Sequence, residues 1–520
     1  MLKINYQRAL ELPTIKYGEE WSKNYGTMNF AIGELDTTRD EPVLFQIYVD
    51  VSASMMEIAS KQQTKMSIVK HTLVNILHHF AENTTNVHVQ IKGFDNRIHN
   101  YISPVLVSKD NINELLKSVE EIRPMNSTDI GLVLNELNRD VDTEYFNIPK
   151  RNRVGIVLTD GEPTSGICNV DELADIVKSE CSYHFIALGN DHNETLMYKL
   201  GHKNCYTSNW FISDIEHTGN VYGEIIFNEL HRVYYENVIR VTGGKVYDYN
   251  KGEFCSEIEL GTLSEETNKD FHLLIDDETI FEITISGKLL DGDTVYSEKS
   301  HCSPTQDGDN MRITKQFLRL CVQKMMFEMR QQSYTRPHEH RDIQFGGFGL
   351  HRANANTCFP PTPCYHPPHP PVLTQMGNEL EEEDVKEEDV KEEDVKEEND
   401  EDPPPLLEED IGLKENVDIF YEFITNFIKT NELEKDDFMI ELLKDINVMK
   451  IGLDNQDVLK YVSSREDTQG RQRTFNTASQ YEQDNSGLIE QDHLERQPTS
   501  AYKTPRRSEL MREISNTTGL

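Results

Sequence analysis

The sequence has no hydrophobic run long enough to cross a membrane, and basic residues are scarce in it. Of the 520 residues, 37% are hydrophobic and 28% are charged, and no stretch approaches the ~18 consecutive apolar residues of a transmembrane helix. Lys and Arg number 52 against 91 Asp and Glu, for a formal net charge of -39. Such a chain repels phosphate backbones. We therefore expect no membrane and no nucleic acid among its partners, and cations or basic molecules are favoured.

Two more absences bear on compartment and chemistry. The first thirty residues carry charges throughout and lack the apolar segment of ~7 to 15 residues that a secretory signal needs. Eight cysteines spread over a long chain without such a signal are typical of reduced thiols. We therefore expect an intracellular, cytoplasmic protein. A Gly-x-x-x-x-Gly-Lys-Ser/Thr run is missing as well, which argues against a nucleotide-driven motor.

One segment carries a third of the net charge. Residues 379–402 hold sixteen Asp or Glu against three Lys, and within them Glu-Glu-Asp-Val-Lys occurs three times in succession at 382–396. A period of five matches neither 3.6 nor 3.5, so the valines cannot form a buried helical stripe. Together with the glycine- and proline-rich stretch before it, this composition predicts a disordered linker over 333–410.

Upstream of the linker, strand and helix patterns alternate. Apolar runs at 44–49, 87–94, 154–159 and 183–188 indicate strands, and helical patterns lie at 64–81, 110–121, 129–139 and 170–179. Strands that are apolar on both faces and alternate with helices are typical of a mainly parallel sheet covered by helices. The sequence therefore predicts a doubly wound α/β domain over 43–235.

The rest of the chain shows other patterns. From 236 to 305 the apolar period drops to two, which predicts a β-sandwich-like domain, and residues 1–42 are an arm that could pair with it. Helical spacing of apolar residues predicts a helix at 313–332 and a helical region at 412–462. The polar tail at 463–520 is expected to be disordered.

Five oxygen-bearing side chains follow the strand ends of the α/β domain. Asp50, Ser52 and Ser54 come directly after the first strand, Thr128 precedes a helix, and Asp160 follows the strand at 154–159. Ligands of doubly wound sheets bind where the strands end. Taken singly, an Asp or Ser before a helix is usually an N-cap. Five such residues on three loops at one edge instead favour a hard cation such as Mg²⁺, with Mn²⁺ or Ca²⁺ as alternatives.

These motifs resemble a known family. Asp50-x-Ser52-x-Ser54, Thr128 within Asn126-Ser127-Thr128-Asp129, and Asp160-Gly161 look like the complete metal-ion-dependent adhesion site (MIDAS) of von Willebrand factor A (VWA) domains, here of an intracellular type. The resemblance covers about 43–235. It implies that these five residues hold the metal, directly or through water, and that the protein is a non-enzymatic interaction or scaffold module. Its partner would then be a protein that presents an Asp or Glu carboxylate to the metal.

Alternatives remain open. Haloacid-dehalogenase-like hydrolases also place an Asp after the first strand and bind Mg²⁺, so Asp50 could be a nucleophile. Those enzymes need a second Asp two residues later as general acid, and Ser52 stands there. A third possibility is a partner subunit of an ATPase assembly. The basic element at 503–508 could be a phosphorylation or docking motif.

Overall fold

The computed structural model describes residues 2–515 with gaps. The gaps fall at 9–11, 14, 16, 34–40, 61–62, 146, 179–180, 190–191, 214–216, 278–279, 290–294, 302–309, 336–407, 454–457 and 476–501. The described residues belong to one compact unit that joins Met1–Arg336 to Leu407–Leu520. The predicted linker at 333–410 lies mostly outside the described residues, although its ends complete helix α8 (Asn310–Thr335) and begin helix α9 (Glu408–Thr430).

A six-stranded sheet forms the α/β part, in the order β10-β9-β8-β3-β6-β7. All neighbouring strands are parallel except the edge strand β7, which runs antiparallel to β6. Every residue of the central strand β3 is buried, since a parallel strand in such a sheet is covered on both faces. The strands are β3 (Val43–Asp50), β6 (Val87–Phe94), β7 (Ile98–Leu106), β8 (Arg153–Thr159), β9 (Ser182–Leu188) and β10 (Thr207–Ile212).

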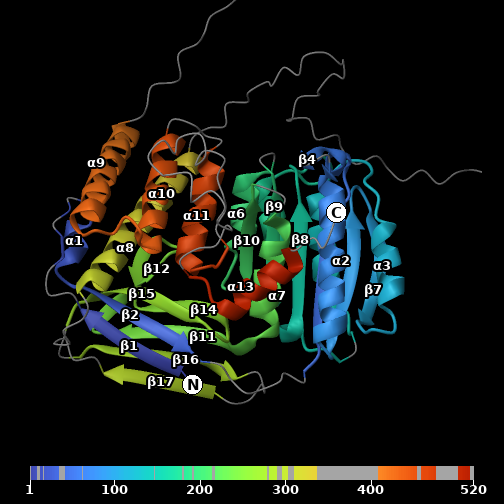
Figure 1. The fold of residues 1–520 in the computed structure, drawn as a ribbon, viewed down its shortest axis with the longest axis horizontal. Coiled ribbons are helices and arrows are strands. Elements are labelled where there is room, and N and C mark those ends of the chain that lie inside the picture. The colour runs from blue at the N-terminus through green and yellow to red at the C-terminus, as the bar shows by residue number, and fades with distance from the viewer. Residues whose placement is uncertain are drawn as a thin grey trace, which may run out of the picture. The chain divides into compact units, whose positions relative to one another are not determined.

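Helices cover both faces of this sheet (Figure 1). One hydrophobic core contains α2 (Lys65–Asn83), α3 (Ile112–Glu120) and α7 (Thr218–Leu230). The core on the other face contains α4 (Ile130–Asp142), α5 (Val170–Ile176) and α6 (Glu194–Gly201). This arrangement, with the further sheets and C-terminal helices described next, confirms the predicted fold class.

Two antiparallel sheets form the β part. One has the order β1-β2-β15-β12-β13 and the other β14-β11-β16-β17, and side chains of both share one hydrophobic core. The N-terminal strand β2 pairs with β15. The domain boundary predicted at 235 falls inside β11, which begins at Arg232. The strands are β1 (Leu2–Arg8), β2 (Tyr25–Ile32), β11 (Arg232–Thr242), β12 (Gly244–Asp248), β13 (Glu253–Cys255), β14 (Glu257–Ser264), β15 (Asn268–Ile275), β16 (Glu282–Leu289) and β17 (Val295–His301).

Helix α8 lies against β2 and β15, where the rings of Tyr25 and Phe317 stand 5.2 Å apart. Helices α9 and α10 (Asp437–Gly452) and helix α11 (Leu459–Arg471) pack on α8. None of the helices in the described part of the chain is long and apolar enough to cross a membrane. The cysteines of that part, namely Cys168, Cys181, Cys205, Cys255 and Cys321, are free thiols.

The prediction of a disordered tail from 463 onward is wrong for two segments. Helix α11 continues to Arg471, and helix α13 spans Pro505–Ser515. The tail is polar in sequence, but several of its charged side chains form ion pairs inside the protein. Arg465 contacts Asp445 at 2.5 Å, and Glu466 pairs with Arg330, all four side chains being at most 3% exposed. Composition alone cannot distinguish such buried pairs from a solvated tail.

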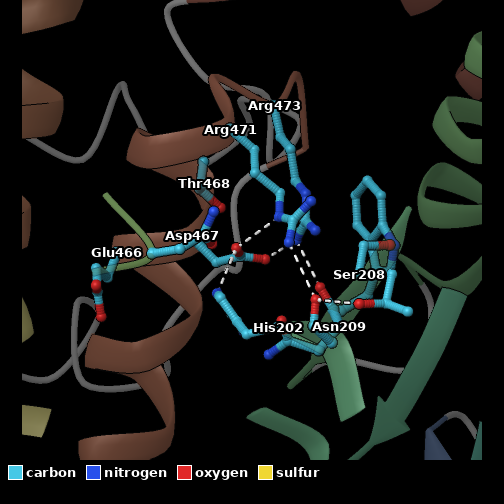
Figure 2. Close-up of polar contacts among 12 residues, drawn as sticks. His202, Ser208, Asn209, Glu466, Asp467, Thr468, Arg471 and Arg473 are labelled. Atoms are coloured by element: carbon cyan, nitrogen blue, oxygen red, sulfur yellow. Dashed lines mark hydrogen bonds and ion pairs between the residues drawn. The ribbon is translucent and has the colours of Figure 1, made fainter. Parts of the chain in front are cut away.

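Asp467 is the centre of another cluster of charged side chains (Figure 2). Its carboxylate lies 2.8 Å from Nε of Arg471 and 2.6 Å from Nη1 of Arg473. Nε2 of His202, at the end of α6, lies 3.3 Å away. Arg473 also donates to the carbonyl of Asn209 on β10 and lies over the ring of Trp210 at 3.7 Å. The cluster thus joins the C-terminal segment to the edge strand of the six-stranded sheet.

Helix α13 packs closely on α7 because α7 has glycines at the contact. A Cβ added at Gly223 would lie 2.6 Å from Cα of Met511, and one added at Gly219 would lie 2.7 Å from Cα of Ser515. Real Cβ contacts are not this short, so only glycine permits this approach. In the basic element at 503–508, Arg507 is buried in α13, whereas the side chain of Lys503 is 55% exposed.

Candidate metal centre

Three loops meet at the carboxyl edge of the six-stranded sheet. The first follows β3 and contains the short 3₁₀ turn Ala53–Met56, the second precedes α4, and the third follows β8. Backbone hydrogen bonds tie them together: Ala53 donates to the carbonyl of Asn126 at 3.0 Å, and Thr164 donates to that of Thr128 at 3.0 Å. The three loops therefore hold their side chains in one small region.

Asp50 and Asp160 are the two carboxylates among the five predicted residues, and they are 0% and 1% exposed. The two oxygens of Asp50 accept hydrogen bonds from neutral donors, the N–H of Ser52 at 2.8 Å and the hydroxyl of Thr159 at 2.7 Å. Burial raises the pKa of Asp50 to about 6, because these bonds only partly offset the loss of water. A cation beside Asp50 would stabilise its charged form.

Serine hydroxyls connect the two carboxylate loops. Oγ of Ser52 lies 2.9 Å from Oγ of Ser54, which donates to Oδ1 of Asp160 at 2.8 Å. Four of the five predicted residues therefore form one chain of contacts. Thr128 is buried at the same edge and reaches the Asp160 loop through its backbone, whose N–H donates to Oγ1 of Thr164 at 2.9 Å. The structure thus brings all five predicted residues to one place.

Lys65 is a residue of this region that the sequence patterns did not reveal. Its Nζ donates to Oδ2 of Asp160 at 2.8 Å and to Oε2 of Glu57 at 2.7 Å. Burial acts to lower the pKa of Lys65, but these two carboxylates outweigh it and raise the pKa above its ordinary value. Lys65 begins α2, and 95 residues separate it from Asp160, so no local motif signals the pair.

A second network holds the loop that carries Thr128. Asp95, fully buried after β6, accepts from the side-chain amide of Asn126 at 2.8 Å and from the N–H of Arg97 at 2.7 Å. Nε2 of His99 lies 3.0 Å from the same carboxylate. Although burial acts to raise the pKa of Asp95, the bonds from Asn126 and His99 hold it below its usual value. Asn126 adopts φ 49°, a conformation that Asn tolerates better than most residues.

The donor set suits a hard cation. Every side-chain donor among the five predicted residues is an oxygen, and two are buried carboxylates, the ligand type that Mg²⁺, Mn²⁺ and Ca²⁺ prefer. Across the described residues, no group of three or more His, Cys, Asp or Glu side chains could hold a metal ion. A centre here would therefore rely on two carboxylates and on hydroxyls.

Part of the chain matches a known protein family, and several solved structures are similar to it. Residues 47–223 match the family model of the von Willebrand factor type A domain. A von Willebrand factor type A protein from Catenulispora acidiphila is 10% identical over 64% of this chain and 82% of its own, with a TM-score of 0.44. The ArnB paralog VWA2 from Sulfolobus acidocaldarius is 12% identical over 64% of this chain and 85% of its own, with a TM-score of 0.40.

A third solved structure is proximal thread matrix protein 1 from the mussel byssus, with a zinc-occupied MIDAS motif. It is 12% identical over 38% of this chain and 50% of its own, with a TM-score of 0.31. No curated protein matches the chain. The family match and the sheet topology identify residues 47–223 as a VWA domain.

Proposed function

We propose that the VWA domain binds one divalent cation, Mg²⁺ in the first place, and uses it to hold a carboxylate of a protein partner. Asp50, Ser52, Ser54, Thr128 and Asp160 would hold the cation, directly or through water. One observation carries the proposal: two buried carboxylates and three hydroxyl residues, from distant parts of the chain, gather at one sheet edge. VWA domains in general are metal-dependent protein-interaction modules, which supports this proposal.

The charge of the region explains why a partner carboxylate would complete it. A divalent ion beside Asp50 and Asp160 is formally neutralised, but Lys65 already shares the charge of Asp160 at 2.8 Å. The ion would therefore keep part of its positive charge. Mg²⁺ keeps several exchangeable waters in its octahedral shell, and an acidic side chain can replace one of them.

The hydrolase alternative receives less support from the contacts. Both oxygens of Asp50 accept hydrogen bonds, which lowers the nucleophilicity of the carboxylate. Ser52, at the position of the general acid, lies 2.9 Å from another hydroxyl, that of Ser54. A serine hydroxyl paired in this way is a poor proton donor at neutral pH. A binding role accounts for the same residues without a proton-transfer step.

Affinity purification with and without chelator tests the proposal. Wild-type protein and Asp50→Asn are compared, and Asp175→Asn, which changes a carboxylate on the outer face of α5, is the matched control. We expect captured proteins to be released from wild type by chelator, to be absent from Asp50→Asn, and to remain on Asp175→Asn. Proteins that stay bound to Asp50→Asn in excess chelator would show that binding uses another surface.

A further inference from the structure

Large apolar side chains are exposed mainly around the candidate metal centre. Seven such side chains are at least 37% exposed among the described residues, and four of them lie on the loops of this centre or directly beside them. Met56 is 58% exposed, Ile58 74%, Met125 40% and Ile167 37%. We call these four residues the apolar collar. Single exposed apolar residues are ordinary on protein surfaces, but a group at one site indicates an interaction surface.

The backbone places the collar at the rim of the site. Met56 and Ile58 follow Ser54 within four residues, and the carbonyl of Ser54 accepts from the N–H of Glu57 at 3.0 Å. The N–H of Met125 donates to the carbonyl of Val51, next to Asp50, at 2.5 Å. Ile167 lies beside Gly131, in the first turn of α4, with 3.5 Å between its Cβ and a Cβ added there. All four residues are thus attached to the loops that carry the predicted ligands.

The turn that carries Met56 directs two neighbouring side chains in opposite directions. Met55 is fully buried, while Met56, the next residue, is 58% exposed. The turn therefore separates two identical side chains, one into the core and one into solvent. Burying Met56 and Ile58 against a partner would remove apolar area from water, the main favourable term in association.

Acidic residues of the same loops restrict what can dock. Glu57 is exposed over 58% of its side chain, and Glu162 is exposed two residues after Asp160. Glu162 repels further negative charge near the centre, and Glu57 does so to the extent that its pair with Lys65 leaves its charge uncompensated. A ligand with one carboxylate for the cation and uncharged neighbours fits this surface, whereas a run of acids does not. The Glu-Glu-Asp-Val-Lys repeats at 382–396 of this chain therefore suit the surface poorly.

We propose that the apolar collar is a docking surface for a protein segment in which one Asp or Glu is flanked by large apolar side chains. The carboxylate binds the cation, and the flanking side chains cover the collar. This inference rests on the proposed function, because the segment's acid is fixed only through the metal. It adds a specificity that the five predicted ligands do not supply, since they recognise any carboxylate.

A displayed peptide library tests the inference on the full chain. Each peptide has Asp or Glu at its centre and three randomised positions on either side, and selection takes place in Mg²⁺. We expect wild type to enrich peptides with Leu, Ile, Met or Phe next to the central acid. Enriched acids without any apolar preference would overturn the inference. Loss of all Mg²⁺-dependent enrichment would instead overturn the proposed function, and this inference with it.

Variants then locate the contact. An enriched peptide is titrated by fluorescence polarisation against wild type, the double variant Met56→Ser/Ile58→Ser and the control Ile280→Ser, whose side chain is 57% exposed on the β part. We expect the double variant to bind at least about tenfold more weakly, with unchanged Mg²⁺ affinity by calorimetry, and the control to bind as wild type does. A peptide of the repeat at 382–396 is expected to bind poorly. Equal affinity of wild type and double variant would refute the inference.

Discussion

Two aspartates close to the six-stranded sheet have opposite surroundings. Asp467 lies among Arg471, Arg473 and His202 beside β10 (Figure 2). Burial acts to raise its pKa, but the two guanidinium groups outweigh burial and hold the pKa of Asp467 well below its usual range. Asp50 is equally buried but accepts from neutral donors, and burial raises its pKa to about 6. The same side chain is thus compensated by cations in one place and bonded only to neutral donors in the other.

This difference predicts different roles for the two charges. A buried charge that the protein compensates itself joins two parts of the fold, and removing one partner leaves the others buried and unpaired. A buried charge with neutral donors lowers stability, and proteins keep such groups at sites where a ligand supplies the missing charge. The comparison predicts that removing the charge of Asp467 lowers the stability of the fold, whereas removing the charge of Asp50 raises it in the absence of metal.

The largest effect is expected for Asp467→Asn. The substitution keeps the size of the side chain but leaves the buried Arg473 and the partly exposed Arg471 without their carboxylate. We expect a loss of about 3 to 5 kcal/mol in the free energy of unfolding, the usual effect of breaking a buried ion pair, measured by urea denaturation. The exposed control Asp175→Asn should leave the midpoint unchanged. A small effect of Asp467→Asn would mean that the cluster does not hold the C-terminal segment.

Removing the other charge, in Asp50→Asn, should weaken Mg²⁺ binding by roughly 100-fold or more, since even groups behind the direct ligands change metal affinity by 10 to 100-fold. Calorimetric titration measures the affinity. In chelator the same variant is expected to unfold at a higher urea concentration than wild type, because it lacks a buried charge with neutral partners. Unchanged Mg²⁺ affinity would remove Asp50 from the site.

Gly223→Ala tests the contact between helix α7 of the VWA domain and helix α13, which covers it. The new methyl group would lie 2.6 Å from Cα of Met511, so α13 must move away from α7. We expect a loss of about 1 to 3 kcal/mol, as for other overpacked contacts, together with faster proteolysis of the C-terminal helix. Gly412→Ala, in helix α9 where nothing lies within 4 Å of an added Cβ, is the control. It should be neutral or stabilising, since Ala favours helices.

The smallest effect is expected for Lys65→Met. This substitution makes the candidate metal centre more negative and so increases its difference from the compensated cluster around Asp467. The ammonium group of Lys65 neutralises part of the charge of Asp160 and would repel a metal ion bound there. Its removal should tighten Mg²⁺ binding about tenfold, equivalent to ~1.4 kcal/mol. Lys70→Met, which changes an amine on the same helix that bonds to the carbonyl of Glu120, is the control. Weaker Mg²⁺ binding in Lys65→Met would show that the amine supports the site.

Part of the fold could be predicted because it depends on local patterns. The apolar run of β3 is a direct consequence of burial on both faces, and alternation of strands with helices determines the class of sheet. Strand ends of such a sheet meet at one edge. For this reason Asp50, Thr128 and Asp160 could be assigned to one site without coordinates, although their role as ligands stays a prediction.

The tail shows where such reasoning fails. Arg465, Glu466 and Asp467 stand together in a polar segment, and composition alone predicted disorder there. Their partners Asp445, Arg330 and Arg473 make these charges part of the core. A charge is expensive to bury only when it is unpaired, and pairing across the fold is invisible in a composition.

The sequence by itself therefore determined the class of the VWA sheet and the edge at which its oxygen side chains gather, because both follow from periodicity along the chain. Only the tertiary structure decided which charges are compensated. It placed Lys65 on Asp160, left Asp50 with neutral donors and exposed Met56 beside the buried Met55. These properties arise from contacts between distant segments and from the direction in which each side chain leaves the backbone, neither of which a local pattern records.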